Sequence, residues 1–278
     1  MRVLFLLPGG ITSQLQAVPA VAALAEQLGA QVQVACAPTA AAVWKLLPAV
    51  EKLIPFDFEA SPSLADWANL LGNVREPDFQ ACVNLASGRQ VNLMLSMSHI
   101  PNRVARAGFS ATSTVQPEGG WAAQAMAAYL RPLGVSLDAA AFRLALPKTV
   151  LEQAAADLPA GEGPALLLAP SGDPNDWPAS QWQALPEQVR RSLPDLRVVR
   201  AAAGSNLQQR AAQIASCDVV LSSDAISTEL ALLCGTPVVA LGRNAGSLPA
   251  RAGVQGCGSH DQLSQLNPAE VLQTLGLA

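Results

Sequence analysis

The stretch 216–243, SCDVVLSSDAISTELALLCGTPVVALGR, constrains the fold most, because it reads as strand, turn, helix and strand in succession. Residues 217–221 form a short apolar run with β-branched side chains, which is typical of a buried parallel strand. Asp224 suits the N-cap of the helix, and Gly-Thr-Pro ends it. Residues 237–241 then predict a second strand. The stretch therefore predicts one βαβ unit with a right-handed crossover.

The turn 222–228 between that strand and that helix is a candidate ligand site. It is predicted to lie at the carboxyl edge of the sheet, where open α/β folds bind ligands. Free backbone amides at the positive end of a helix suit an anion. Glu229 lies one turn further and is placed to accept hydrogen bonds from ribose hydroxyls. The structural alternative stays open, in which Asp224 only caps the helix and Glu229 only complements its dipole.

The chain begins with a similar pattern. Residues 2–7 predict an apolar strand, Pro-Gly-Gly a turn, and residues 14–28 a helix. Gly9 and Gly10 allow the backbone to approach a ligand closely, or simply make a tight turn. Their surroundings lack the GxGxxG and GxxxxGK[ST] spacings, so neither a dinucleotide fingerprint nor a Walker phosphate loop is predicted.

The alternation of strands and helices predicts two domains. A chain of 278 residues exceeds the usual single domain, and the segment PAGEGP is typical of a link, so we place the domains at 1–150 and 151–278. Alternating elements form parallel sheets. The expected fold class is α/β, with two Rossmann-like, doubly wound domains facing across a cleft that is the default place for a small ligand. The further expected elements are strands 31–35, 52–56, 79–84, 103–108, 165–169 and 196–200, and helices 39–47, 63–71, 88–96, 119–133, 149–158, 180–191, 206–215 and 267–275.

Composition excludes several classes of function. Half of the residues are hydrophobic and 14% are charged, which excludes disorder as the main state. The net charge of −4 argues against binding nucleic acid without regard to sequence. No apolar run of about 18 residues occurs, and a strand-like run follows Met1 directly, so a cytoplasmic protein is predicted. Five cysteines without CxxC spacing and two histidines predict neither a metal site nor a histidine triad.

Five segments in order resemble glycosyltransferase family 9, the ADP-heptose:lipopolysaccharide heptosyltransferases, which have the two-domain GT-B fold. The resemblance spans nearly the whole chain, and its individual motifs are loose. The segments are MRVLFLLPGGITSQLQAVPAVAAL, PDFQACVNLASGRQVNLMLSMSHIPNRVARAGF, GGWAAQAMAAYLRPLGV, LLLAPSGDPNDWPASQW and SCDVVLSSDAISTELALLCGTPVVALGR.

The resemblance implies that the two domains bind different substrates. The first domain would be the acceptor side, through Gly9, Gly10, Ser13 and Gln14. The second would hold a nucleotide-diphosphate sugar as substrate, with an ADP-linked donor favoured over a UDP-linked one and with no cofactor or metal. The implied donor-binding residues are Ser171, Gly172, Asn175, Ser223, Asp224, Ser227, Thr228, Glu229 and Arg243. Within this set, the amides carry the diphosphate, Glu229 holds the ribose, and Arg243 supplies positive charge.

Departures from the family pattern affect the chemistry. An ungapped match puts Ser13 where the family has the aspartate taken to be the base, and a serine has no useful pKa for that task. Asn175 and Asp176 stand where the family has a lysine shortly before Trp-Pro, and Glu229 stands where it has a histidine. Another base is then required, and Asp66, Asp78 and Glu118 are candidates between which the sequence does not choose.

These residues leave three hypotheses about the function of the chain. The first is a transferase that moves a sugar onto lipopolysaccharide or another glycan acceptor. The alternative is a catalytically degenerate relative that binds a nucleotide or regulates, and the third is an epimerase-like protein or GT-B hydrolase. The resemblance implies a lipid-linked acceptor and weak peripheral association with the inner membrane. The apolar side chains of Leu93, Met94, Leu95 and Met97 are expected either to contact lipid or to lie in the core.

Overall fold

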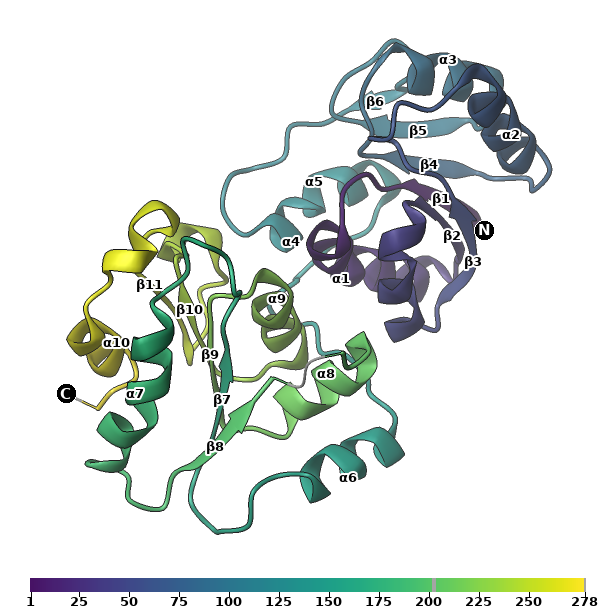
Figure 1. Ribbon diagram of the computed structural model, residues 1–278. Coiled ribbons are helices and arrows are strands. Elements are labelled where there is room, and N and C mark those ends of the chain that lie inside the picture. Colours follow the sequence, from purple (N-terminus) through teal and green to yellow (C-terminus); the bar gives the residue numbers. More distant parts are fainter. Residues whose placement is uncertain (202–203, 278) are drawn as a thin grey trace. The chain divides into compact units, whose positions relative to one another are not determined.

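The computed structural model describes residues 1–201 and 204–277. The chain divides into two compact units, Met1–Ala139 and Ala140–Ala278. Each unit contains one parallel β-sheet with helices around it (Figure 1). Two parallel sheets in one chain confirm the predicted α/β class with two Rossmann-like domains.

The sheet of the first unit has the order β3-β2-β1-β4-β5-β6, and all its strands run parallel. The order reverses direction between β1 and β4, which makes a topological switch point at the carboxyl ends of these two strands. The strands are β1 (Arg2–Leu6), β2 (Gln31–Cys36), β3 (Val50–Pro55), β4 (Ala81–Asn84), β5 (Asn102–Ala105) and β6 (Ser113–Thr114).

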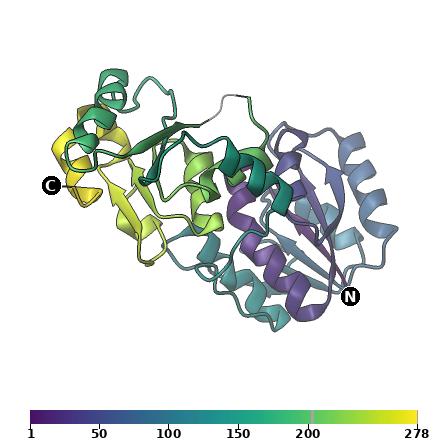
Figure 2. The same ribbon diagram turned by 90° about the horizontal axis from the view of Figure 1, so that it is seen from below.

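Helices cover both faces of this sheet, which is why β1 is buried along nearly its whole length. Leu4 and Leu6 share one core with α2 (Leu64–Arg75) and α3 (Arg89–Met97). Alternate side chains of a strand point to opposite faces, so the neighbouring residues of β1 face the side that α1 (Ile11–Leu28) covers (Figure 2).

Two predicted helices of the first unit differ from the observed elements. The predicted helix 39–47 is the 3-10 segment η1 (Pro38–Leu46). The predicted long helix 119–133 is wrong, because it breaks into α4 (Ala122–Ala125), α5 (Ala127–Leu130) and the 3-10 turn η2 (Arg131–Leu133). Several hydrogen bonds here span three residues, as from the Tyr129 amide to the Met126 carbonyl at 3.0 Å, which tightens the turns and interrupts a regular α-helix.

The sheet of the second unit has the order β11-β10-β9-β7-β8, again all parallel. Its strands are β7 (Ala165–Ala169), β8 (Arg197–Arg200), β9 (Val219–Ser222), β10 (Val238–Leu241) and β11 (Val254–Cys257). The edge strand β11 was not predicted, because its sequence VQGC carries little apolar signal and only Cys257 is buried. The other elements are α6 (Lys148–Ala156), α7 (Ala179–Arg190), α8 (Leu207–Ala215), α9 (Ala225–Cys234), η3 (Ala245–Ser247), η4 (His260–Gln265) and α10 (Pro268–Thr274).

The division between the units falls after Ala139, earlier than the predicted boundary at 150. The Leu144 amide donates to the Leu233 carbonyl at 2.8 Å, and the Arg251 guanidinium donates to the Ala140 carbonyl at 3.4 Å. These bonds attach the residues after Ala139 to the second unit. Tertiary hydrogen bonds rather than the Pro/Gly segment therefore place the boundary.

Burial of the free cysteines agrees with their apolar sequence context. Cys36, Cys82, Cys217 and Cys257 are buried and none forms a disulfide. Burial raises the pKa of the Cys36 thiol to about 11 and that of Cys234 to about 12, so these thiols stay protonated and unreactive at neutral pH. Among the described residues, no helix is both long and apolar enough to span a bilayer.

Candidate functional site

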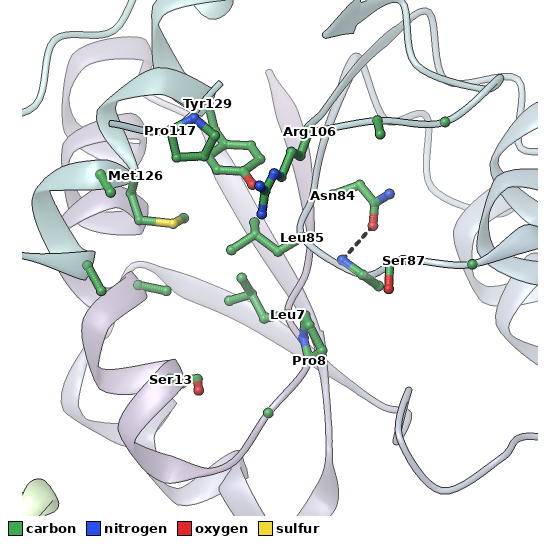
Figure 3. A pocket seen from close by; sticks show the side chains of 18 of the residues that line it. Leu7, Pro8, Ser13, Asn84, Leu85, Ser87, Arg106, Pro117, Met126 and Tyr129 are labelled. Atoms are coloured by element: carbon green, nitrogen blue, oxygen red, sulfur yellow. Dashed lines mark hydrogen bonds between the residues drawn. The ribbon is translucent and has the colours of Figure 1, made fainter. Parts of the chain in front are cut away.

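A pocket of about 1020 Å³ lies at the carboxyl edge of the first sheet (Figure 3). Its walls come from the segments after β1, β3, β4 and β5 and from residues 116–129. All of these belong to the first unit. The pocket therefore occupies the switch-point position at which open parallel sheets bind ligands.

The turn after β1 forms one wall and depends on Gly9. This glycine has φ +85°, and a Cβ there would lie 2.7 Å from Ser13 Oγ. The exposed Ser13, predicted on the acceptor side, lines the pocket. Gly10 is the N-cap of α1 and supplies no side chain to cap it.

Gln14, predicted on the acceptor side, is instead completely buried and does not line the pocket. Its side-chain amide donates to the carbonyls of Leu7 at 3.0 Å and Pro8 at 3.1 Å. Its oxygen accepts from Trp44 Nε1 at 3.0 Å. Gln14 therefore holds the backbone of the turn, because carbonyls turned into an apolar core need donors. This corrects its predicted role as a ligand contact.

Charged and aromatic groups give the pocket its chemistry. Arg89, Arg106 and Glu59 are exposed and line it. Figure 3 shows the Arg106 guanidinium beside the ring of Tyr129, below Pro117. Burial raises the pKa of the Tyr129 phenol, and the charge of Arg106 partly opposes that shift. With Leu7 and its apolar neighbours on the opposite wall, the pocket suits a polar or anionic group attached to an apolar one.

Asn84 ends β4 at the base of this pocket and is only 2% exposed. Its oxygen accepts from the Ala86 amide at 3.0 Å, the bond drawn in Figure 3. Its Nδ2 has no hydrogen-bond partner within the described residues. A buried donor without a partner costs free energy. This donor could not be predicted from the sequence, because Asn84 stands inside an apolar strand.

None of the three candidate bases lines the pocket. Asp66 is held in a capping box with Ser63, and those hydrogen bonds lower the pKa of Asp66. Glu118 pairs with Arg131 at 3.1 Å on the surface. Within the described lining, Glu59 is the carboxylate present. Its position just beyond the predicted strand 52–56 was the signal that could have identified it, because parallel strands end at the same edge.

In the second unit, the turn after β9 is closed by its own hydrogen bonds. Asp224 caps α9 by accepting from the Ser227 amide at 2.8 Å, and it pairs with Arg210 at 3.1 Å. The Thr228 amide donates to the Asp224 carbonyl at 2.9 Å, and Ser222 Oγ donates to the same carbonyl at 2.9 Å. The hydroxyl of Ser227 is buried with no partner in the described part of the chain.

The loop after β7 lies beside this turn, because β7 and β9 are paired. The Ser171 amide donates to Ser223 Oγ at 2.9 Å, and the Gly172 amide to Asp176 at 3.1 Å. Asp176 also accepts from the Trp177 amide at 2.6 Å. The amides of Ser171 and Gly172, which were predicted to bind a diphosphate, therefore already have acceptors within the protein. Asn175 is exposed on the same loop.

Glu229 and Arg243 form an ion pair at 3.4 Å. The Glu229 side chain is 1% exposed and that of Arg243 is 26% exposed. Arg243 also donates to the Ser247 carbonyl at 3.0 Å. A carboxylate this deep binds an internal cation because an isolated buried charge is costly. The structure thus brings together two residues that were predicted to serve different parts of the donor.

Six of the nine predicted donor residues therefore meet as three internal pairs: Ser171 with Ser223, Asp224 with Ser227, and Glu229 with Arg243. The amides of Ala225 and Ile226 open α9, where helix geometry provides no intrahelical acceptor.

Comparison with known proteins gives structural matches only. No protein-family model matches the chain. No curated protein matches it in sequence.

Solved structures match over its full length. A glycosyl transferase of family 9 from Veillonella parvula is 15% identical, with a TM-score of 0.77 over 99% of this chain and 96% of that one. The E. coli ADP-heptose lipopolysaccharide heptosyltransferase II is 15% identical, with a TM-score of 0.74 over 99% of this chain and 98% of that one. An E. coli heptosyltransferase solved with ADP is 15% identical, with a TM-score of 0.70 over 99% of each chain. The chain therefore has the GT-B fold of these transferases, and its resemblance to glycosyltransferase family 9 is confirmed at the level of the fold.

Proposed function

We propose that this protein transfers a sugar from a nucleotide-diphosphate donor to a hydroxyl of a glycan or lipid-linked acceptor. The observation that carries the proposal is the pocket of about 1020 Å³ at the switch point of the first sheet, in a chain that matches such transferases end to end. A cavity of that size accommodates a sugar with part of its aglycone. Fold analogy alone would not support the proposal, because one fold serves many functions.

In this proposal the first unit binds the acceptor and the second binds the donor. Ser13 and the glycine turn border the acceptor, which occupies the pocket. The donor diphosphate approaches the amides of Ala225 and Ile226 at the start of α9. The Asp224 carboxylate opposes an anion there, while Arg210, paired to it at 3.1 Å, offsets that charge. The neighbour solved with ADP supports an ADP-linked donor.

Glu59 is the group we assign as the base, because Ser13 replaces the family aspartate and Glu59 is the carboxylate that lines the pocket. The acceptor hydroxyl oxygen attacks the anomeric carbon as its proton passes to Glu59. The bond between that carbon and the diphosphate oxygen breaks, and the diphosphate leaves with the electron pair. No step of the proposal passes through a metal or a cofactor.

Donor binding is tested by thermal unfolding with ADP-, GDP-, UDP- and dTDP-sugars. A ligand that binds only the native state raises the melting temperature, so an ADP-sugar is expected to give the largest rise. Transfer is then tested by donor consumption with a crude glycolipid extract. A flat thermal response to all four donors contradicts the proposal, and consumption that needs no acceptor indicates a hydrolase instead.

The role of Glu59 is tested by Glu59→Gln, with Glu51→Gln as an exposed carboxylate control outside the pocket. Loss of a positioned base lowers turnover by about 10²- to 10⁴-fold. The donor-induced rise in melting temperature is expected to stay unchanged in both variants. Full turnover in Glu59→Gln assigns the base to another group.

A second candidate is a nucleotide-binding relative without catalysis. The departures from the family pattern favour it, because Ser13 stands where the family has its base and Asn175 and Asp176 stand where it has a lysine. Donor binding without turnover, in the same two assays, supports this candidate over the transferase.

A further inference from the structure

We propose that the second unit binds a phosphate group, either the free ion or a small monoester, between Arg143 and Arg251 at the C-terminal end of α9. This phosphate site is separate from the turn proposed for the donor, which lies at the other end of the same helix. The ten residues of α9, Ala225–Cys234, place the two ends about 15 Å apart. The inference goes beyond the proposed function and does not depend on sugar transfer.

The two arginine side chains of the phosphate site meet at one backbone oxygen. Arg143 Nη1 donates to the Ala140 carbonyl at 2.7 Å, and Arg251 Nη1 donates to the same oxygen at 3.4 Å. The two nitrogens therefore lie at most about 6 Å apart, the sum of these two distances, and like charges this close repel one another. Because the two residues are far apart in sequence, the fold brings these charges together.

The two positive charges have no described carboxylate to balance them. Neither guanidinium forms an ion pair with any residue of the described ranges. The surrounding segments 139–151 and 230–260 contain no Asp or Glu. The C-terminal end of a helix carries the equivalent of about half a negative charge, which offsets only part of the charge of two guanidinium groups. The pair therefore keeps an excess of positive charge that an anion would neutralise.

Arg251 is the more deeply held of the two arginines. Its Nη1 also donates to the Leu232 carbonyl at 3.2 Å, whereas its buried Nη2 has no hydrogen-bond partner among the described residues. Burial, together with the charge of Arg143, lowers the pKa of Arg251. A buried donor without an acceptor costs free energy, and the cost is greater for a charged group. The oxygen of an anion would supply the missing acceptor.

Arg143 is exposed and has unused donors. Its Nη1 donates to the carbonyls of Ala140 and Phe142, while Nε and Nη2 have no acceptor in the described part of the chain. The side chain lies over Gly235, which has φ +81° and where an added Cβ would collide with Arg143 Nε. Glycine at residue 235 thus ends α9 and also leaves the space that Arg143 occupies. Because Arg143 is exposed, it can turn toward an anion from solvent without disturbing the core.

Charge and shape select a phosphate over other small anions. A phosphate monoester carries about 1.5 to 2 negative charges at pH 7, which matches two guanidinium groups, whereas a carboxylate carries a single charge. The planar guanidinium fork donates two parallel hydrogen bonds to a phosphate. Charge-assisted bonds of about 2.8 Å from two sides can meet on one tetrahedral group across a gap of this size.

The test is isothermal titration calorimetry of the full chain with inorganic phosphate, glycerol phosphate and acetate at constant ionic strength. The wild-type protein is expected to bind phosphate with a Kd below about 1 mM and to bind acetate about tenfold more weakly. Arg143→Gln is expected to weaken phosphate binding about tenfold, because it removes charge-assisted hydrogen bonds. Arg191→Gln is the matched control, because Arg191 is an exposed arginine of the same unit outside the phosphate site, and it should bind as the wild type does.

The two phosphates distinguish the sources of the ligand. Tighter binding of glycerol phosphate than of inorganic phosphate supports a monoester as the occupant, and the reverse order supports the free ion. Three results overturn the proposal: no binding of either phosphate, equal binding by Arg143→Gln and Arg191→Gln, or acetate binding as tight as that of phosphate.

Thermal unfolding separates ligand binding from a purely structural role of the two arginines. Phosphate should raise the melting temperature of the wild type and of Arg191→Gln but not that of Arg143→Gln. Arginines that only complement the helix dipole would give Arg143→Gln the same loss of stability with and without phosphate, which would overturn the proposal. Hydrogen exchange of wild-type residues 140–144 needs no variant. It should slow when phosphate is added, and unchanged exchange also overturns the proposal.

Discussion

Both sheets are parallel and both have a switch point in their strand order, but the carboxyl edges at those switch points have different surroundings. In the first unit, the N-cap residues of α1 and α3 are Gly10 and Gly88, neither of which has a side chain to cap the helix, and a cavity of about 1020 Å³ lies beside them. In the second unit, Asp224 caps α9 and pairs with Arg210, while Asp176 closes the neighbouring loop.

This difference shows that a clear helix signal and a ligand site are separate properties. Asp224 made α9 easy to predict from the sequence, because the side chain of an N-cap residue accepts a hydrogen bond from the first turn of its helix. The same acceptor uses the Ser227 amide that a phosphate would otherwise bind. Uncapped glycine turns are weak sequence signals, yet they leave space for a ligand.

Arg243→Ala is expected to lower the free energy of unfolding by about 3 kcal/mol, because it leaves the buried Glu229 carboxylate without this cation. Urea unfolding measures the loss. Arg191→Ala, at an exposed arginine, serves as the control. Adding Glu229→Gln to Arg243→Ala should recover part of the loss, and equal midpoints for Arg243→Ala and the control would show that the pair contributes nothing.

Gln14→Leu is expected to cost about 2 kcal/mol, because it removes the donor to the Leu7 and Pro8 carbonyls and the acceptor for Trp44 Nε1. Trp44→Phe removes only the bond from Trp44 Nε1 to Gln14 Oε1, so the part of its cost that comes from lost hydrogen bonds should be smaller. The free energies of unfolding from urea titration compare the two variants. A cost for Gln14→Leu near zero would mean that the turn after β1 holds its shape without that side chain.

Gly9→Ala should cost about 1–2 kcal/mol, because Gly9 has φ +85° and an added Cβ would lie 2.7 Å from Ser13 Oγ. Gly10→Ala is the matched control, since Gly10 has φ −84° and its added Cβ would meet nothing within 4 Å. The melting temperatures of Gly9→Ala and Gly10→Ala measure the difference in stability. Equal melting temperatures would refute the claim that the pocket wall requires glycine specifically at residue 9.

Asp224→Ala is expected to cost about 1 kcal/mol through the loss of the α9 cap. Asp224→Ser should cost less, because a serine hydroxyl can still accept from the Ser227 amide. Thermal unfolding of both variants measures the difference. If the two variants were equally unstable, the pairing with Arg210 rather than the cap would be the stabilising interaction.

Most strands could be predicted from sequence because their signal is local. The apolar runs at 2–7 and 165–169 coincide with β1 and β7 to within a residue. The prediction of a continuous helix failed around Met126, where hydrogen bonds alternate between three- and four-residue spacing. The edge strand β11 was missed because few of its side chains are buried. Edge strands pack on fewer neighbours, so their sequences are less constrained.

The candidate site was predictable only in part. Ser13 lines the pocket, but Gln14 on the same helix turns into the core and donates to backbone carbonyls. Glu59 and Arg106 enter the pocket from different strand ends that lie far apart in sequence. No spacing rule links them, because only the order of strands in the sheet makes them neighbours.

By itself, the sequence determined the two series of strands and helices, the cap of α9 and the tight turn at Gly9. Each of these features depends on residues that lie within a turn or two of one another in the chain. Only the tertiary structure decided which polar groups satisfy one another. Whether an amide at residue 227 or a carboxylate at residue 229 is available to a ligand depends on Asp224 and Arg243, and folding brings the cation at 243 to Glu229 from beyond the next strand.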